Sequence, residues 1–205
     1  MDRRIILASS SPRRKELLAK MGVQFEAIPS DFAEWLDDDR PVTDMAIDLG
    51  LGKARVLADR YPEAIVIGSD TIVTLGKRQF GKATSETDAR LMLYEQVGHR
   101  TTVTTSVVVM CRALGVELAA APQAEVVFKR RNDRAIAAYL ETGDWKDKAA
   151  AWGIQSGAAP LISHIKGEYS TIVGLPVTQL AMFLHELGIP TQPVILAPPV
   201  PQRRL

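Results

Sequence analysis

The chain has 205 residues, a length that suits one domain. Hydrophobic residues make up 46% of it and charged residues 24%, a balance that excludes general disorder, and no apolar run approaches the roughly 20 residues of a membrane span. The formal net charge of +1 excludes a global attraction to nucleic acid, so an anion must be bound by a local cluster. The single cysteine, Cys111, excludes an internal disulfide and a zinc site of paired cysteines. We expect a cytoplasmic globular protein with no nucleic acid and no membrane among its partners.

Strands and helices alternate through the first half of the sequence. Ser11 is a suitable N-cap, Pro12 a suitable first helical residue and Gly22 a typical stop. The continuous apolar run at 64–68 predicts a strand that is covered on both faces. In chain order, the expected elements are a strand at 5–8, a helix from Pro12 to Gly22, a strand at 23–28, an acidic loop at 29–41, a helix from a Thr43 cap to about Arg60, and strands at 64–68 and 72–75.

The second half of the sequence predicts an antiparallel section between helices. Gly76 and Lys77 predict a hairpin turn, and Ser85 with Asp88 resembles a capping box. The further expected elements are a helix from Ser85 to near Gly98, antiparallel strands at 101–111 and 116–128, a helix from an Asn132 cap to near Gly143, a strand at 161–165 and a helix at 176–187 closed by Gly188. This order predicts an α/β fold, a twisted mixed sheet flanked by helices.

The C-terminal segment differs in composition from the rest of the chain. We expect one domain at residues 1–189 and a tail at 190–205, in which five of 16 residues are proline. Such a composition predicts an extended, flexible course. The tail, with Arg203 and Arg204 near its end, could dock a partner in an extended conformation; the alternative is an inert end.

The segment 9–14, Ser-Ser-Ser-Pro-Arg-Arg, has the composition of a phosphate cradle. A strand runs into a serine-rich turn where a helix begins, and free backbone N–H groups at a helix start favour anions. Arg13 and Arg14 add planar donors that suit phosphate. The alternatives are a capped helix with two solvated arginines and a phosphorylation site.

Asp70 directly follows the buried strand 64–68. In open α/β sheets, ligand crevices form at the carboxyl ends of strands, where a carboxylate can hold Mg²⁺ or orient a water. The alternative is a turn or helix cap, but the strand-like residues 72–75 do not continue as a helix.

Three further regions carry weaker signals. Lys53 and Lys82 are solvated charges by default, although the turn at Gly76 could return Lys82 toward Asp70. Glu34 is the better metal candidate in the acidic loop, because acidic runs such as 37–39 are usually solvated. The segment 147–157 mixes charges, small residues, Trp152 and Gln155, and by itself it is uninformative.

Taken together, these segments resemble the Maf family, once described as septum-formation inhibitors and understood as nucleoside triphosphate pyrophosphatases. The resemblance covers residues 5 to about 187. The matching pieces occur in family order: LASSSPRRKELL, F-x-x-I followed by Glu34, GSDTIV, Lys82, DKAAAWGIQ and GEYSTIVGLPV. Each piece alone is modest evidence for the family, but all of them in the family order are a specific signal.

The resemblance implies an inosine-triphosphatase-like fold of two lobes with a central cleft, and a divalent metal, Mg²⁺ or Mn²⁺. Asp70 would be the catalytic acid/base and touch the metal, and Glu34 would assist the metal or the water. Lys82 would also serve catalysis. The implied substrate contacts are Ser9, Ser11, Arg13 and Arg14 for the triphosphate, Lys53, Lys82 and Lys148 for its charge, Asp147 in support, and Arg13, Thr71 and Gln155 for base selection.

Gln155 indicates the family branch that acts on dTTP and UTP. A neutral amide can pair with the carbonyl and N–H of a uracil or thymine edge, whereas the 7-methyl-GTP branch is expected to carry an acidic residue there. The sequence departs from the family pattern nearby: Ala150 and Ser156 replace glycines, Trp152 replaces a tyrosine, and Ala83 replaces a proline. These departures concern substrate choice more than the type of reaction.

The implied activity is hydrolysis of nucleoside triphosphates to monophosphates and pyrophosphate, for dTTP, UTP and modified pyrimidine nucleotides. Its purpose would be to remove non-standard nucleotides or to control pyrimidine triphosphate levels. One alternative is an enzyme for 7-methyl-GTP or for a broad set of nucleotides. Another is a non-catalytic, nucleotide-binding regulator of cell division. A homodimer is compatible with the resemblance.

Overall fold

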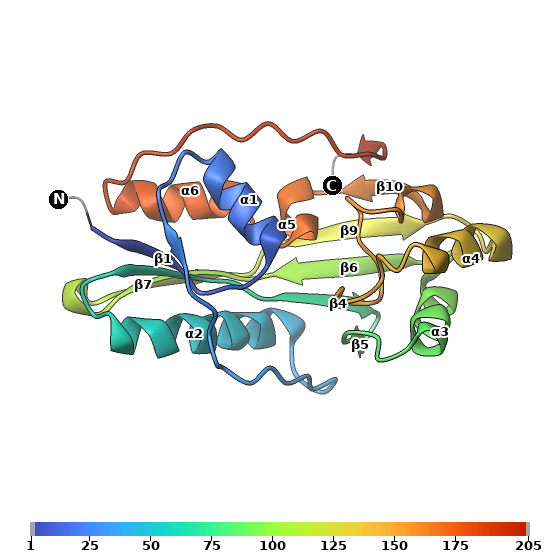
Figure 1. The fold of residues 1–205 in the computed structure, drawn as a ribbon, viewed down its shortest axis with the longest axis horizontal. Coiled ribbons are helices and arrows are strands. Elements are labelled where there is room, and N and C mark those ends of the chain that lie inside the picture. Colours follow the sequence, from blue (N-terminus) through green and yellow to red (C-terminus); the bar gives the residue numbers. More distant parts are fainter. Residues whose placement is uncertain (1–2, 204–205) are drawn as a thin grey trace.

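A computed structural model describes residues 3–203, which form two mixed β-sheets flanked by helices (Figure 1). The first sheet has the strand order β2-β1-β3-β7-β8, formed by Glu26–Ala27, Ile5–Leu7, Ile65–Gly68, Val107–Cys111 and Val116–Ala120. The second has the order β11-β10-β9-β6-β4-β5, formed by Gln202–Arg203, Ile162–Lys166, Gln123–Phe128, Arg100–Thr105, Thr71–Leu75 and Arg78–Phe80. The α/β class with a mixed sheet is therefore confirmed, with the sheet divided in two.

The chain passes between the two sheets at three places. β3 leads into β4 through Ser69 and Asp70, β6 into β7 through Ser106, and β8 into β9 through 121–122. The prediction of single strands at 101–111 and 116–128 was wrong, although their antiparallel pairing is confirmed by β7–β8 and β6–β9. At the break, Ser106 N–H donates to the Asp70 carbonyl (2.8 Å) and Asp70 N–H donates to Ser106 Oγ (2.9 Å). These bonds fix Asp70 at the crossing between the sheets.

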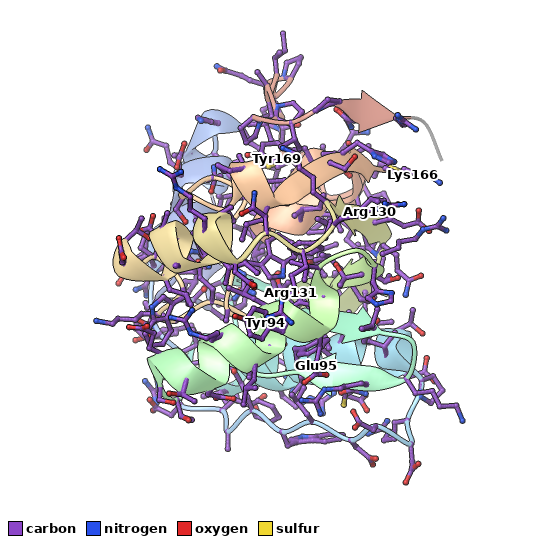
Figure 2. The ribbon with its side chains drawn as sticks, turned by 90° about the vertical axis from the view of Figure 1, so that its right-hand side faces the viewer. Tyr94, Glu95, Arg130, Arg131, Lys166 and Tyr169 are labelled. Atoms are coloured by element: carbon purple, nitrogen blue, oxygen red, sulfur yellow. The ribbon has the colours of Figure 1, made fainter. Side chains whose placement is uncertain are left out.

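The helices cover both faces of the first sheet and one end of the second. α2 (Val42–Arg60) lies on one face of the first sheet, and α1 (Pro12–Lys20) and α6 (Val177–Glu186) lie on the opposite face (Figure 1). The short α5 (Tyr169–Val173) lies beside α1 and packs on β6 and β9 of the second sheet. α3 (Glu86–Gln96) and α4 (Asp133–Glu141) pack against each other near the second sheet (Figure 2). Two short 3₁₀ turns are Arg112–Leu114 and Ala159–Leu161. No helix within residues 3–203 is long and apolar enough to cross a membrane.

Local signals placed most helix ends correctly. Ser85 Oγ accepts from Asp88 N–H (3.1 Å), and Asn132 Oδ1 accepts from Ala135 N–H (3.1 Å), so both expected caps are confirmed. The Thr43 cap was wrong, because α2 begins at Val42 and Pro41 occupies the cap position. The strand expected at 23–28 is reduced to the two residues of β2.

The tail has an extended course across the face that carries α1, as the final segment of Figure 1 shows. Gln192 N–H donates to the Met21 carbonyl (2.8 Å), and β11 pairs in parallel with β10. Val200 is buried in the main core cluster. The flexibility and the domain boundary at 189 stay predictions, and Arg204 lies outside the described residues.

Candidate active site

A cleft of about 530 Å³ opens where the two sheets meet. Its walls come from both sheets, from α1, from the loop before α2 and from the irregular segment between α4 and β10. Every site residue expected from the sequence lines this cleft: Ser9, Ser11, Arg13, Arg14, Glu34, Lys53, Asp70, Thr71, Lys82, Asp147, Lys148 and Gln155. The structure thus brings the candidates together, while their individual roles stay predictions.

The N-terminus of α1 faces the cleft with no side-chain cap. Ser11 occupies the cap position, but its hydroxyl makes no capping hydrogen bond. Ser9 Oγ instead accepts from Ser11 N–H (3.2 Å), which shapes the turn before the helix. Uncapped N–H groups at a helix start, together with the helix dipole, favour an anion. This end of the cleft can therefore hold a phosphate group.

The two neighbouring arginines differ in their partners. Arg14 donates to the Gly174 carbonyl (2.8 Å), to Thr71 Oγ1 (3.2 Å) and to Ser9 Oγ (3.3 Å). Arg13 is partly buried in the cleft wall, and burial lowers the pKa of its guanidinium without removing its charge. Arg14 therefore joins the walls of the cleft, whereas Arg13 is the arginine with donors to offer a ligand.

Lys53 joins the two carboxylates of the site. Its ammonium contacts the Asp70 carboxylate and donates to Glu34 Oε1 (2.6 Å). Lys53 and Asp70 are each only 7% exposed. The approach of α2 depends on Gly68, where a Cβ would lie 2.3 Å from the Gly50 carbonyl oxygen. A side chain at Gly68 would separate Lys53 from Asp70.

Glu34 reaches this pair from the loop at 29–41. The ring of Phe32 packs directly on Gly52 of α2, where an added Cβ would lie 2.3 Å from the ring. This contact holds the loop against α2. Glu34 Oε2 also lies 3.9 Å from Lys82 Nζ. Burial raises the pKa of Glu34, but the hydrogen bond and charge of Lys53, helped by Lys82 and Arg14, leave this pKa below its ordinary value. Glu34 is therefore a carboxylate at neutral pH.

The donor set at Glu34 and Asp70 fits a divalent cation that also binds phosphate. Within residues 3–203 no cluster of three or more His, Cys, Asp or Glu side chains could hold a metal alone. Mg²⁺ is commonly held by one or two carboxylates together with substrate phosphates. The two carboxylates beside the open end of α1 meet that description.

The segment 147–157 forms the other half of the cleft. Asp147, Ala150 and Ala151 all have positive φ, at 58°, 58° and 60°, which side chains other than glycine rarely adopt. Ala150, which replaces a glycine of the family pattern, is in the left-handed conformation that glycine adopts freely. Burial and the charge of Arg13 lower the pKa of Lys148. Gln155 lies exposed on the cleft wall, where its amide is open to a ligand.

Some cleft residues were missed by sequence reasoning. Phe32 and Lys146 line the cleft, and Gly174 contributes a carbonyl that accepts from Arg14 and from Ser69 Oγ (3.1 Å). Lys146 stands next to Asp147 and could have been noticed. No local pattern marks Phe32, since its role depends on a glycine twenty positions later. Thr71, expected to act in base selection, accepts a hydrogen bond from Arg14 of α1 (3.2 Å).

An α/β fold whose cleft combines an uncapped helix N-terminus, Arg13, lysines and paired carboxylates defines a protein that binds a phosphorylated ligand. The chain belongs to the Maf family, because residues 4–187 match the family model described as Maf-like protein.

Curated relatives extend over nearly the whole chain. A protein of Anaeromyxobacter dehalogenans is 39% identical over 93% of this chain and 97% of its own length. Proteins of Deinococcus radiodurans and Bacillus cereus are each 37% identical over 91% of this chain, and over 94% and 97% of their own lengths. All three are named dTTP/UTP pyrophosphatase.

Proposed function

We propose that this chain hydrolyses nucleoside triphosphates to the monophosphate and pyrophosphate, with dTTP and UTP as preferred substrates. The observation that carries the proposal is the buried Asp70 carboxylate, which Lys53 connects to Glu34. This group lies in the cleft that the N-terminus of α1 faces. The similarity to relatives named dTTP/UTP pyrophosphatase over more than 90% of the chain supports the same reaction.

Asp70 is the proposed base. A water molecule attacks the α-phosphorus while its proton passes to the Asp70 carboxylate. The bond between the α-phosphorus and the oxygen that leads to the β-phosphorus breaks, and pyrophosphate leaves with that electron pair. Lys53 holds Asp70 in one orientation, and a positioned base of this kind contributes about 10²–10⁴-fold to a rate.

Cations of the cleft stabilise the charge that develops on the leaving group. Arg13 and the first N–H groups of α1 bind phosphate oxygens, and Lys82 and Lys148 add positive charge from the facing wall. Glu34 and Asp70 would hold Mg²⁺ or Mn²⁺, which supplies Lewis-acid polarisation of the phosphates when bound.

Base selection is proposed for Gln155. Its amide can donate to a carbonyl and accept from the ring N–H of uracil or thymine, whereas cytosine has no ring N–H to donate. Trp152 and Ser156 line the cleft with Gln155, and Ala150 is buried in the same segment. All three depart from the family pattern, so a preference for 7-methyl-GTP or a broad specificity is the competing outcome.

The test is pyrophosphate release with Mg²⁺ or Mn²⁺ from dTTP, UTP, CTP, modified pyrimidine triphosphates and 7-methyl-GTP. We expect dTTP and UTP to turn over, and Asp70→Asn to lower kcat by about 10²–10⁴-fold while dTTP still binds. Asp39→Asn, an exposed change in the acidic loop, is the matched control and should keep wild-type rates. Nucleotide binding without turnover would contradict the proposal and favour a regulator instead.

A further inference from the structure

Gln96, at the end of α3, has a buried side chain whose hydrogen bonds lead to the base half of the cleft. The residue is completely buried, and it does not line the cleft. Its Nε2 donates to the Ala150 carbonyl (3.0 Å) and to the Met92 carbonyl (2.9 Å), and its Oε1 accepts from the Trp152 indole N–H (2.8 Å). One amide thus holds two positions of the segment that carries Gln155.

The contact with Ala150 explains how an alanine stays in a left-handed conformation. Ala150 N–H donates to the Gly81 carbonyl (2.9 Å), and the Ala150 carbonyl accepts from Gln96, so the peptide units on both sides of the Ala150 Cα are fixed. Sparsely populated backbone conformations persist only where the surroundings determine them, and they cluster at ligand sites. Ala149 also forms a β-bridge with Lys82, so the backbone next to Ala150 is aligned with a lysine that is proposed to balance phosphate charge.

The contact with Trp152 fixes an aromatic wall of the cleft. Trp152 lines the cleft three positions before Gln155. Its ring packs edge-on against Phe128, with centroids 5.5 Å apart and planes at 82°. The packing restricts the ring, and the hydrogen bond to Gln96 Oε1 selects which edge points inward.

The end of α3 is itself anchored. The guanidinium of Arg131, in the turn before α4, lies 4.0 Å from the ring centroid of Tyr94, and both residues are labelled in Figure 2. Tyr94 precedes Gln96 by two residues, and α3 packs against α4. Gln96 therefore projects from a fixed helix end.

We propose that Gln96 is a positioning residue for base discrimination: it holds Ala150 and Trp152 so that Gln155 presents its amide to the base in one orientation. The inference rests on the proposed pyrophosphatase function and extends it to a residue that touches no substrate. Misplacing a binding group by about 1 Å can lower a rate by about 10²-fold. A residue that only positions the binding groups, as Gln96 does, therefore has a measurable effect on hydrolysis.

The test compares Gln96→Met with wild type in steady-state hydrolysis of dTTP and CTP. Methionine has a similar volume but cannot make the three hydrogen bonds. We expect KM for dTTP to rise by about tenfold, kcat to stay within about threefold, and the preference for dTTP over CTP to fall. Thr101→Val is the matched control, since Thr101 is equally buried and donates to the Val126 carbonyl (3.4 Å) away from the cleft. It should lower the melting temperature without changing the preference.

Two further variants separate positioning from general destabilisation. Glycine adopts positive φ freely, so Ala150→Gly in the Gln96→Met background should restore part of the lost dTTP affinity. Trp152→Phe should add little to Gln96→Met, because both changes break the same bond. The indole N–H resonance of Trp152, observed by ¹⁵N NMR, should shift in Gln96→Met and not in Thr101→Val.

The failures of the two proposals are distinguishable. Suppose that the wild type is active and that Gln96→Met changes the dTTP preference no more than Thr101→Val does, or leaves it unchanged. This result overturns the role of Gln96 and leaves the pyrophosphatase proposal intact. If the wild type binds nucleotides but hydrolyses none, the pyrophosphatase proposal fails, and the same comparison is made with Kd for dTTP and CTP. A wild type that neither binds nor hydrolyses the panel overturns both.

Discussion

The two halves of the cleft are built in different ways. The half proposed to bind phosphate, called the phosphate half, uses regular structure: the end of β1, the start of α1, the crossing after β3 and one face of α2. The half proposed to bind the base is an irregular segment with alanines at positive φ, held by two hydrogen bonds with Gln96 of α3 and one with Tyr139 of α4. Parts fixed by helices and strands suit chemistry that is common to all substrates, whereas a segment held by a few contacts can vary to suit different bases.

Among the predictions that follow, we expect the largest effects from replacing Arg14 and Arg13, which should change different properties of the protein. Arg14→Ala removes three hydrogen bonds between the cleft walls, so the melting temperature should fall by roughly 5 °C or more, and activity with it. Arg13→Ala should raise KM for dTTP by about tenfold at an unchanged melting temperature, because Arg13 serves the ligand. Calorimetry and steady-state kinetics on the two variants check this. Equal effects of both changes would contradict the division of roles.

A smaller effect is expected behind the base half. Tyr139 of α4 accepts from Gly153 N–H through its hydroxyl (3.2 Å), and burial raises the pKa of that hydroxyl, so it stays protonated. Tyr139→Phe removes the acceptor and should raise KM for dTTP by about threefold, with kcat unchanged, since one hydrogen bond contributes about 1 kcal/mol. A fall in kcat without a change in KM would place Tyr139 with the phosphate half.

The smallest effect concerns acid stability. The pKa of Glu34 is lower in the folded protein than in the unfolded chain, where no Lys53 is paired with it. Glu34 therefore contributes stability that is present above its unfolded pKa of about 4.3 and is lost as the pH falls through the folded value. We expect the melting temperatures of wild type and Glu34→Gln to differ by a constant amount above about pH 5.5 and to converge below about pH 4.3. A difference that widens toward acid pH would contradict the sign of this shift.

The sequence predicted the phosphate half better than the base half. Ser11 with Pro12 and the apolar run before Asp70 are local signals of the phosphate half, and α1 and β3 form where these signals predict them. The caps at Ser85 and Asn132 placed α3 and α4 in the same local way, but not the contacts that these helices make with the base half. The division into two sheets was missed because it depends on Ser106 bonding to Asp70, which lies 36 positions earlier in the chain.

Contacts between distant positions also explain what was missed in the base half. Gln96 lies 54 positions from Ala150 and 56 from Trp152, so nothing near it in the sequence marks its role. The short helix α5 was not predicted because its five residues are too few for a helical period. The homodimer, the metal and the mobility of the tail stay predictions.

The most direct test of the division between the two halves is kcat/KM for dTTP and for 7-methyl-GTP in wild type and in Gln155→Glu. We predict that the wild type prefers dTTP, and that Gln155→Glu lowers this preference by about tenfold or more with little change in kcat, because a carboxylate cannot donate to a carbonyl of thymine. A wild type that prefers 7-methyl-GTP, or a variant that keeps the wild-type preference, would contradict the account.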